Sequence, residues 1–383
     1  MSIEELFKIA VEKKASDLHL IVGMPPYLRI DGQLGPIKNR PNISQKIAEE
    51  LIYPIITEEQ KKILLNKKEL DLSYEIKTGH RFRVNLHWEK NNLGLVARVI
   101  SSEIPTMEDV KMPEVVYRLL DMYQGLILMT GPTGCGKSTT LAAMINHINT
   151  NKSAHIVTLE DPIEFLFKPQ KSIVKQRQLH TDMITFQDAL IHVLRQDPNV
   201  IMVGEMRDLA TIAATITLAE TGHLVLATLH THNAAQTIDR IIDIFPSHQQ
   251  QQIRLQVSMT LTGIISQNLI PQEGGGRVAT REILLNTPAV ANLIRENKIA
   301  QIKTVIQTSA KEGMITMDQD LINMFSQKLI SKETAQSHMT HPEMLNWSIE
   351  STKQKMTLKN LGHFFYWDGL TNSLACVILR CWV

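Results

Sequence analysis

The chain has 383 residues, 43% of them apolar, and its 40 basic and 39 acidic residues leave a formal net charge of +1. This size favours a folded protein of two or three domains, and the balanced charge argues against nucleic acid or an anionic membrane as the main partner. Three cysteines, Cys135, Cys376 and Cys381, are too few for a disulfide framework or a four-cysteine zinc site, which suits the reducing cytoplasm.

The N-terminus carries Glu4 and Glu5 where a secretory signal would be basic, so we expect no export. The longest apolar runs, such as residues 375–379, fall far short of the roughly 20 residues that cross a bilayer. Any membrane contact should therefore be peripheral.

The first hundred residues predict a small mixed α+β domain. Helical spacing of apolar residues covers 2–12 and 47–65. Short strands are predicted at 18–22, 27–30, 71–76, 81–88 and 94–100. We place this domain at 1–103 and a proline-marked linker at 104–113.

From residue 114 onward strands and helices alternate, which predicts an α/β domain with a parallel sheet. The strands are expected at 126–129, 156–159, 200–203 and 224–228, and the helices at 138–148, 186–194 and 209–219. Helical patterns then dominate over 234–337, so this domain should extend to residue 345 with a helical C-terminal part. The tail, 346–383, holds three of the four tryptophans, and its role cannot be inferred from its composition.

A phosphate-binding motif of the form G-x-x-x-x-G-K-[S/T] follows the strand at 126–129 and opens a helix, which is the context that the motif requires. Its backbone N–H groups would surround phosphate, Lys137 would reach the β- and γ-phosphates, and Ser138 would bind Mg²⁺. The expected nucleotide-binding residues here are Gly131, Pro132, Thr133, Gly134, Cys135, Gly136, Lys137, Ser138 and Thr139. Because Cys135 lies near a helix N-terminus, we also expect a lowered thiol pKa, and we expect alkylation of Cys135 to block nucleotide binding.

Carboxylates at strand ends are the candidates for organising a metal and orienting water. Glu205 follows the strand 200–203 and would help to hold Mg²⁺, although a helix-start acid is the simpler alternative. Glu160, Asp161 and Glu164 crowd around a proline after another strand, which favours a nearby cation or donor groups, although Asp161 could simply cap a turn.

His223 and His230 flank the strand 224–228, and we interpret them as polar sensors near phosphate rather than zinc ligands. Several arginines could reach a neighbouring site, although a surface ion pair is the simpler interpretation for most of them. They are Arg81, Arg83, Arg98, Arg195, Arg207 and Arg240.

Four segments, 131–140, 158–165, 195–208 and 220–230, resemble the type II/IV secretion ATPases, and within them the chain is most similar to the retraction ATPases of type IV pili. The resemblance covers about 2–345. It implies a PAS-like first domain, a RecA-like second domain and a hexameric ring at the cytoplasmic face of the inner membrane, docked to the pilus platform protein. A paralogous retraction ATPase is a further candidate partner.

The resemblance also implies roles for individual residues. Glu164 matches the catalytic glutamate of the family's Asp box, and Glu205 the acid of its atypical Walker B segment. His223 and His230 match its His box. Arg83, Arg98, Arg195 and Arg240 match arginines that contact nucleotide. ATP and Mg²⁺ are the implied cofactors.

Two features place the chain on the retraction side: it has no four-cysteine zinc insertion, and the PAS-like pattern starts at the first residues. It departs from the family's retraction motif at Ala291, where the family has an arginine. An accessory retraction ATPase, or a nucleotide-binding scaffold ring with little hydrolysis, remains an alternative. Near-neutral charge disfavours a DNA motor.

Overall fold

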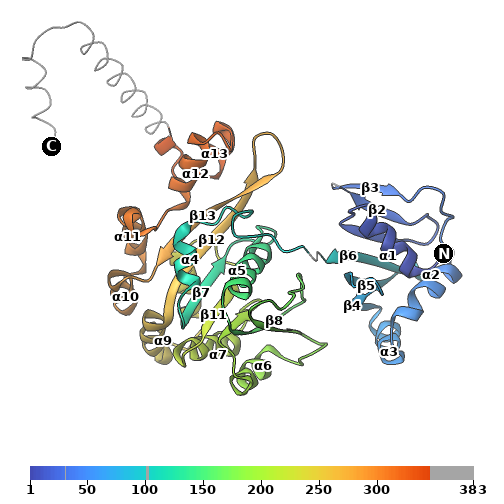
Figure 1. The fold of residues 1–383 in the computed structure, drawn as a ribbon, viewed down its shortest axis with the longest axis horizontal. Helices are drawn as coiled ribbons and strands as arrows, with labels where there is room; N and C mark the ends of the chain where they lie inside the picture. The colour runs from blue at the N-terminus through green and yellow to red at the C-terminus, as the bar shows by residue number, and fades with distance from the viewer. Residues whose placement is uncertain (31, 101–102, 346–383) are drawn as a thin grey trace, which may run out of the picture. The chain divides into compact units, whose positions relative to one another are not determined.

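The computed structural model describes residues 1–30, 32–100 and 103–345, and its first hundred residues fold as an antiparallel sheet covered by helices (Figure 1). The strand order is β3-β2-β1-β6-β5-β4. The strands are β1 (Asp17–Leu20), β2 (Tyr27–Ile30), β3 (Gln33–Pro36), β4 (Glu69–Glu75), β5 (Arg81–Glu89) and β6 (Asn92–Ile100). The mixed α+β order expected from the sequence is present, with β3 as a strand that the sequence did not predict.

Helix α1 (Ile3–Glu12) begins where the Ser2 side chain accepts a hydrogen bond from the Glu5 backbone N–H. Its buried face includes Phe7, whose ring stacks on Phe82 of β5 with 4.2 Å between centroids. The helical pattern predicted over 47–65 is confirmed, although it is not one continuous helix. The chain instead forms α2 (Gln45–Ile52), a 3₁₀ turn η1 (Tyr53–Ile55) and α3 (Glu58–Lys67), because Pro54 cannot donate to a continuing helix and Thr57 forms a new capping box with Gln60.

Residues after 113 build a seven-stranded sheet in the order β13-β12-β7-β11-β10-β8-β9. Strands β9, β8, β10 and β11 pair in parallel, which confirms the predicted α/β class. The strands are β7 (Gly125–Thr130), β8 (His155–Glu160), β9 (Ile173–Gln178), β10 (Val200–Val203) and β11 (Leu224–Leu229). The helices between them are α4 (Glu114–Leu120), α5 (Lys137–Asn151), α6 (Phe186–Val193) with the 3₁₀ turn η2 (Leu194–Gln196), and α7 (Leu209–Glu220).

The helical pattern expected over 234–337 is wrong in its middle. After α8 (Ala234–Asp243) and α9 (Ser247–Thr260), the chain forms a long antiparallel hairpin of β12 (Leu261–Pro271) and β13 (Arg277–Leu285). Most of β12 is buried on both faces, so its apolar residues do not alternate and their spacing cannot separate strand from helix. The turn between the strands holds three glycines with positive φ, Gly274, Gly275 and Gly276, which were the available signal.

The remaining helices follow the hairpin. They are α10 (Pro288–Arg295), η3 (Ile299–Gln301), α11 (Ile302–Thr308), η4 (Ala310–Glu312), α12 (Met317–Ser326) and α13 (Lys332–His338). Helices α12 and α13 share a small hydrophobic core with the hairpin, in which Ile270 and Val278 pack with Leu321 and Met339 (Figure 1).

By their packing the described residues form two compact units: one within 1–129, 137–229 and 241–262, and the other within 130–136, 230–240 and 263–345. The predicted domain boundaries at 103, 113 and 345 stay predictions. The tail predicted at 346–383 lies outside the described residues, and with it the cysteines Cys376 and Cys381. None of the described helices is long and apolar enough to cross a membrane.

Candidate functional site

The phosphate-binding motif forms the loop between β7 and α5. Gly131, Gly134 and Gly136 adopt φ values of +143°, +79° and +85°, which side chains other than glycine rarely allow. At Gly131 space also requires glycine, since a Cβ there would lie 2.2 Å from the backbone oxygen of Gln267. Helix α5 then begins at Lys137, which is buried. This strand, loop and helix order is the arrangement that receives phosphate at a helix N-terminus.

Cys135 is buried, with 3% of its surface exposed, and its Sγ atom packs against Gly131. Because a reagent must reach the sulfur, this burial should slow alkylation of the thiol; that alkylation blocks nucleotide binding stays a prediction. Proximity in sequence to a helix N-terminus gave no information on this burial.

An acidic cluster lies where the neighbouring parallel strands β8 and β10 end. Gly204 permits a close approach there, since a Cβ at that position would lie 3.1 Å from the Leu159 carbonyl oxygen. Arg207 joins the two acidic segments: its Nη2 donates to Glu205 Oε2 at 2.8 Å, and its Nη1 lies 3.5 Å from Asp161 Oδ2. The hydrogen bond that Arg207 donates to Glu205 raises the pKa of Arg207 further. The sequence suggested a cation near these acids, and Arg207 is one.

Glu160 differs from the other acids because it is buried at the end of β8. Its carboxyl group accepts hydrogen bonds from Thr158 Oγ1 at 2.6 Å and from Gln176 Nε2 at 3.1 Å. Burial nevertheless raises the pKa of Glu160 to about 7, against these two hydrogen bonds and one from the Glu164 backbone, which lower it. This carboxyl can therefore gain or lose a proton near neutral pH.

Two glutamines on one face of β9 hold the segment after Glu160. The Gln176 amide donates to the Phe165 carbonyl at 2.8 Å and accepts from the Phe167 N–H at 2.9 Å, and Gln178 accepts from Ile163 at 3.4 Å. Glu164, between these anchors, is exposed. Sequence reasoning missed both glutamines; their i, i+2 spacing in a strand was the available signal.

The structure does not bring the two candidate histidines together. His223 precedes β11, where its Nδ1 lies 3.0 Å from the Leu218 carbonyl oxygen, whereas His230 follows the strand. Arg195, in η2, similarly precedes β10, whereas Glu205 follows it, so the two lie at opposite ends of the strand. Arg240 is exposed in the last turn of α8.

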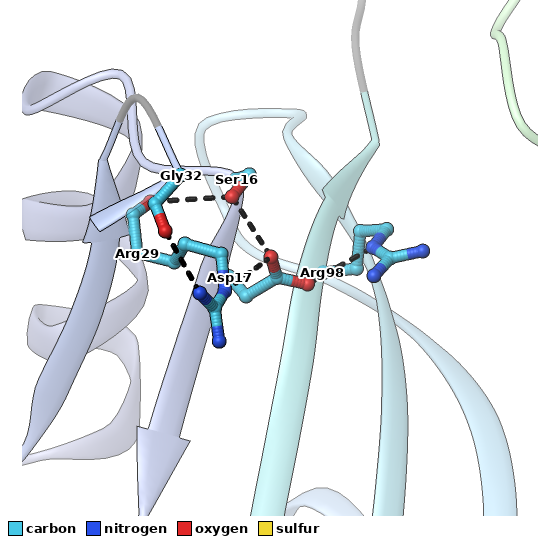
Figure 2. A network of polar contacts seen from close by, with 5 residues as sticks. All are labelled: Ser16, Asp17, Arg29, Gly32 and Arg98. Carbon is cyan, nitrogen blue, oxygen red and sulfur yellow. Dashed lines mark hydrogen bonds and ion pairs between the residues drawn. The ribbon is translucent and has the colours of Figure 1, made fainter. Parts of the chain in front are cut away.

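Arg83 and Arg98 belong to a row of charged residues across the N-terminal sheet. In the antiparallel registers Arg83 lies opposite Arg98, Arg98 opposite Asp17, and Asp17 opposite Arg29. Figure 2 shows the buried Asp17 carboxylate, which accepts from Arg98 Nε at 2.9 Å and from Ser16 Oγ at 2.8 Å. The Nε atom of Arg29 lies 3.8 Å from Asp17 Oδ2, the oxygen that Ser16 also contacts. Opposite residues share a sheet face, so three guanidinium groups and one carboxylate make this row positive.

In the part of the chain that the structure describes, no group of three histidines, cysteines or acids could hold a metal ion on its own. Mg²⁺ does not need such a cage, since it commonly keeps waters and takes phosphate oxygens with one or two protein oxygens. Ser138, in the first turn of α5, is suited to supply one of them.

Comparison with known proteins agrees with this geometry. The family model described as type II/IV secretion system protein matches residues 1–337. The chain belongs to this family. It is 47% identical over 343 residues to the type IV pilus retraction ATPase PilT of Pseudomonas aeruginosa, covering 90% of this chain and 99% of that protein.

A second relative and a solved structure are also similar to this chain. The type IV pilus ATPase PilU of Pseudomonas aeruginosa is 39% identical, with 88% of each chain covered. A crystal structure of the pilus retraction motor PilT with bound ADP matches with a TM-score of 0.84 and 44% identity, over 90% of this chain and 99% of that one. The family, its ATPase character and the α/β fold expected from the sequence are confirmed.

The departure from the retraction motif lies in α10. Ala291 is on the buried side of this helix with 9% of its surface exposed, whereas Arg295 is exposed. An arginine at position 291 would start from this packed side of α10, so its long side chain would have to extend past the packed residues to reach solvent.

Proposed function

We propose that this chain is a Mg²⁺-dependent ATPase that powers retraction of type IV pili as a hexameric ring. The observation that carries the proposal is the phosphate loop, with its glycine geometry and helix start, in a chain that matches PilT over nearly the full length of both proteins. The acidic cluster at the ends of β8 and β10 adds the groups that hydrolysis needs beyond binding.

The roles of the site residues follow from their chemistry. Lys137 would neutralise charge on the β- and γ-phosphates, and the loop N–H groups would orient them. Ser138, with Glu205 acting through water, would hold Mg²⁺, which when bound neutralises charge on the phosphates. Glu164 would orient the attacking water, and its exposure on a loop anchored by Gln176 and Gln178 suits a carboxylate that must face a nucleotide.

A ring would give the remaining candidates a function in a neighbouring subunit's site. The row of Arg29, Arg98 and Arg83 presents positive charge on an exposed sheet face, which suits the phosphates of a nucleotide bound by another chain. His230, Arg195 and Arg240 of the second domain would contribute polar or charged groups to a nucleotide site. His223 would do so from its position just before β11. The ring would dock to an inner-membrane platform protein at the cytoplasmic face.

Retraction as the principal motor is favoured over an accessory function because identity to PilT, 47%, exceeds identity to PilU, 39%. The presence of Lys137, Glu164 and Glu205 disfavours a scaffold ring without hydrolysis.

The first test is Mg²⁺-dependent ATP hydrolysis by the purified chain as a function of its own concentration, with Glu164→Ala as a matched variant. We expect turnover per chain to rise with concentration and to vanish in the variant. Concentration-independent turnover that survives the substitution would contradict a ring with a shared site. Expression in a strain without its own retraction ATPases then tests the biological function: restored twitching supports a principal motor, and restoration only beside a second ATPase supports an accessory one.

A further inference from the structure

Gln267 of β12 lies against the phosphate loop and is almost completely buried, with 2% of its surface exposed. Its side-chain Nε2 donates a hydrogen bond to the backbone oxygen of Cys135 at 2.7 Å. Its own backbone oxygen lies so close to Gly131 that a Cβ there would approach it to 2.2 Å. One residue of β12 therefore contacts the loop near both its start and its end.

The orientation of the Gln267 amide is set from the other side by Arg281. Arg281 lies directly opposite Gln267 in the hairpin register, and its Nε donates to Gln267 Oε1 at 2.9 Å. A guanidinium group has only donors, so it can face the oxygen of an amide but not its NH₂ group. With the oxygen held by Arg281, the amide nitrogen must face the loop, where the Cys135 carbonyl accepts.

Arg281 is itself fixed within the hairpin and α12. It is 3% exposed, and burial lowers its pKa to about 10, so it remains a cation at neutral pH. Its backbone N–H donates to Asp320 Oδ2 at 2.8 Å, and Thr280 Oγ1 donates to the same oxygen at 2.9 Å. The nearby Asp320 carboxylate favours the charged guanidinium. A polar chain thus runs from Asp320 on α12 through Arg281 and Gln267 to the phosphate loop.

The contact of Gln267 with the Cys135 carbonyl also determines the direction of the next backbone N–H group, that of Gly136. In a planar trans peptide the C=O and N–H groups point in opposite directions. Gln267 draws the Cys135 carbonyl toward β12, so the N–H of Gly136 in the same peptide points away from β12. Backbone N–H groups of this loop are the donors that receive phosphate oxygens. An unheld peptide could turn and present a carbonyl oxygen to the phosphate instead.

We propose that Gln267 is a positioning residue for nucleotide binding, which fixes the peptide of Cys135 and Gly136 so that its N–H faces the phosphates, and that Arg281 sets the Gln267 amide for this task. The inference rests on the proposed nucleotide binding at the loop. It adds to the motif a residue about 130 positions further along the chain.

The test is the affinity of the full chain for ADP, measured by titration calorimetry in Gln267→Leu and Gln267→Glu. The glutamate of the second variant would keep the size of the side chain and an oxygen for Arg281, but it cannot donate and would place an oxygen against the Cys135 carbonyl. We expect each substitution to weaken ADP binding by about tenfold. In steady-state hydrolysis, KM for ATP should rise by a similar factor, with kcat at saturating ATP changed less than about threefold.

Ser266→Ala is the matched control. Ser266 is a buried neighbour on the same strand, and it accepts a hydrogen bond from Thr130 Oγ1 at 2.8 Å, before the loop begins. This variant should lose thermal stability but keep ADP affinity within about twofold of the wild type. Circular dichroism checks that the variants fold, and Gln267→Glu keeps the test available if Gln267→Leu does not.

Wild-type affinity in both Gln267 variants would overturn this inference alone. Equal losses in the Gln267 variants and in Ser266→Ala would also overturn it, because they would indicate a general effect of weakening β12. A wild-type chain that binds neither ADP nor ATP would instead overturn the proposed function, and this inference with it.

Discussion

Arg83 and Arg98 lie directly opposite each other on β5 and β6, so two like charges face each other on one side of the N-terminal sheet. Such a pair is unfavourable without compensation. Asp17 supplies part of it, through its hydrogen bond from Arg98 and its proximity to Arg29 (Figure 2). An arrangement that keeps positive charge beside positive charge is better suited to receiving an anion than to stabilising the sheet.

Asp17→Asn should therefore destabilise the N-terminal sheet. The substitution removes the negative charge that lies between the guanidinium groups of Arg29 and Arg98, and we expect a loss of about 1 kcal/mol in the free energy of unfolding, since Arg98 is largely exposed to solvent. Urea unfolding measures the loss. Asp71→Asn, which alters an exposed hydrogen bond with Asn85 on the same sheet, is the control. An equal change in both variants would contradict a special role for Asp17.

Lys137→Ala should abolish ATP hydrolysis. The substitution removes the cation expected on the terminal phosphates, and ATP affinity should fall by about tenfold to a hundredfold, the range for a hydrogen bond to a charged group. A coupled phosphate-release assay and titration with ATP provide the two readouts. Lys152→Ala is a useful control, since Lys152 follows the same helix and contacts the Leu120 carbonyl. Wild-type turnover in Lys137→Ala would refute the assignment of the loop.

Arg207→Met should lower the Mg²⁺ concentration needed for half-maximal hydrolysis. Arg207 occupies Glu205 and lies near Asp161, so removing it leaves two carboxylates that attract a divalent cation more strongly. We expect a shift of about twofold to fivefold. Arg207→Lys retains the charge and should behave like the wild type. A higher Mg²⁺ requirement in Arg207→Met would show that Arg207 supports the metal-binding geometry instead of competing with the metal.

Glu160→Gln should flatten the dependence of stability on pH. Burial raises the pKa of Glu160 to about 7 from its ordinary value of 4.5. Between pH 4.5 and 7 the native Glu160 carboxyl still holds its proton, whereas the unfolded one has lost it. The contribution of Glu160 to the free energy of unfolding therefore falls as pH rises from 4.5 to 7 and is constant above pH 7. The full effect is about 3 kcal/mol. Urea unfolding at about pH 5 and about pH 8, on either side of the raised pKa, measures it, with exposed Glu164→Gln as control. Equal slopes in wild type and Glu160→Gln would contradict this account.

Cys135 should react slowly with iodoacetamide in the native chain and rapidly in urea, because its thiol is buried. The measurement uses a chain with Cys376→Ser and Cys381→Ser, so that mass spectrometry follows Cys135 alone. Once Cys135 is alkylated, the added group would push Gly131 out of its place in the loop or break the contact between the loop and Gln267, and ADP binding should be lost. Full nucleotide binding by a completely alkylated chain would contradict the close packing of this thiol.

The parts of the site that follow from local sequence could be predicted. The phosphate loop is specified by glycines whose backbone angles other residues rarely adopt, and Glu205 follows a short apolar strand that places it at the sheet edge. Both features depend on a few adjacent residues. The α/β class likewise follows from the alternation of short apolar strands with amphipathic helices.

The supporting residues could not be predicted, because each acts on a segment far away in the sequence. Gln267 and Gln176 are glutamines in strands, which commonly face solvent, and only the folded sheet shows that they bind backbone groups of other segments. Arg207 could be placed near Glu205 by sequence, but its contact with Asp161 depends on the pairing of β8 and β10. Burial on both faces of β12 removed the periodicity that would have identified it as a strand.

The β12–β13 hairpin is synthesised after all the nucleotide-binding segments. A nascent chain that has reached residue 235 already contains the phosphate loop, the acidic cluster and His230, but not the glutamine that faces the Cys135 carbonyl. When the hairpin forms, a slip of one residue in its register would put Ser266 or Asn268, in place of Gln267, opposite Arg281. If Gln267 positions the loop as proposed, the nucleotide affinity of the segment made first depends on the strand pairing of a segment made later.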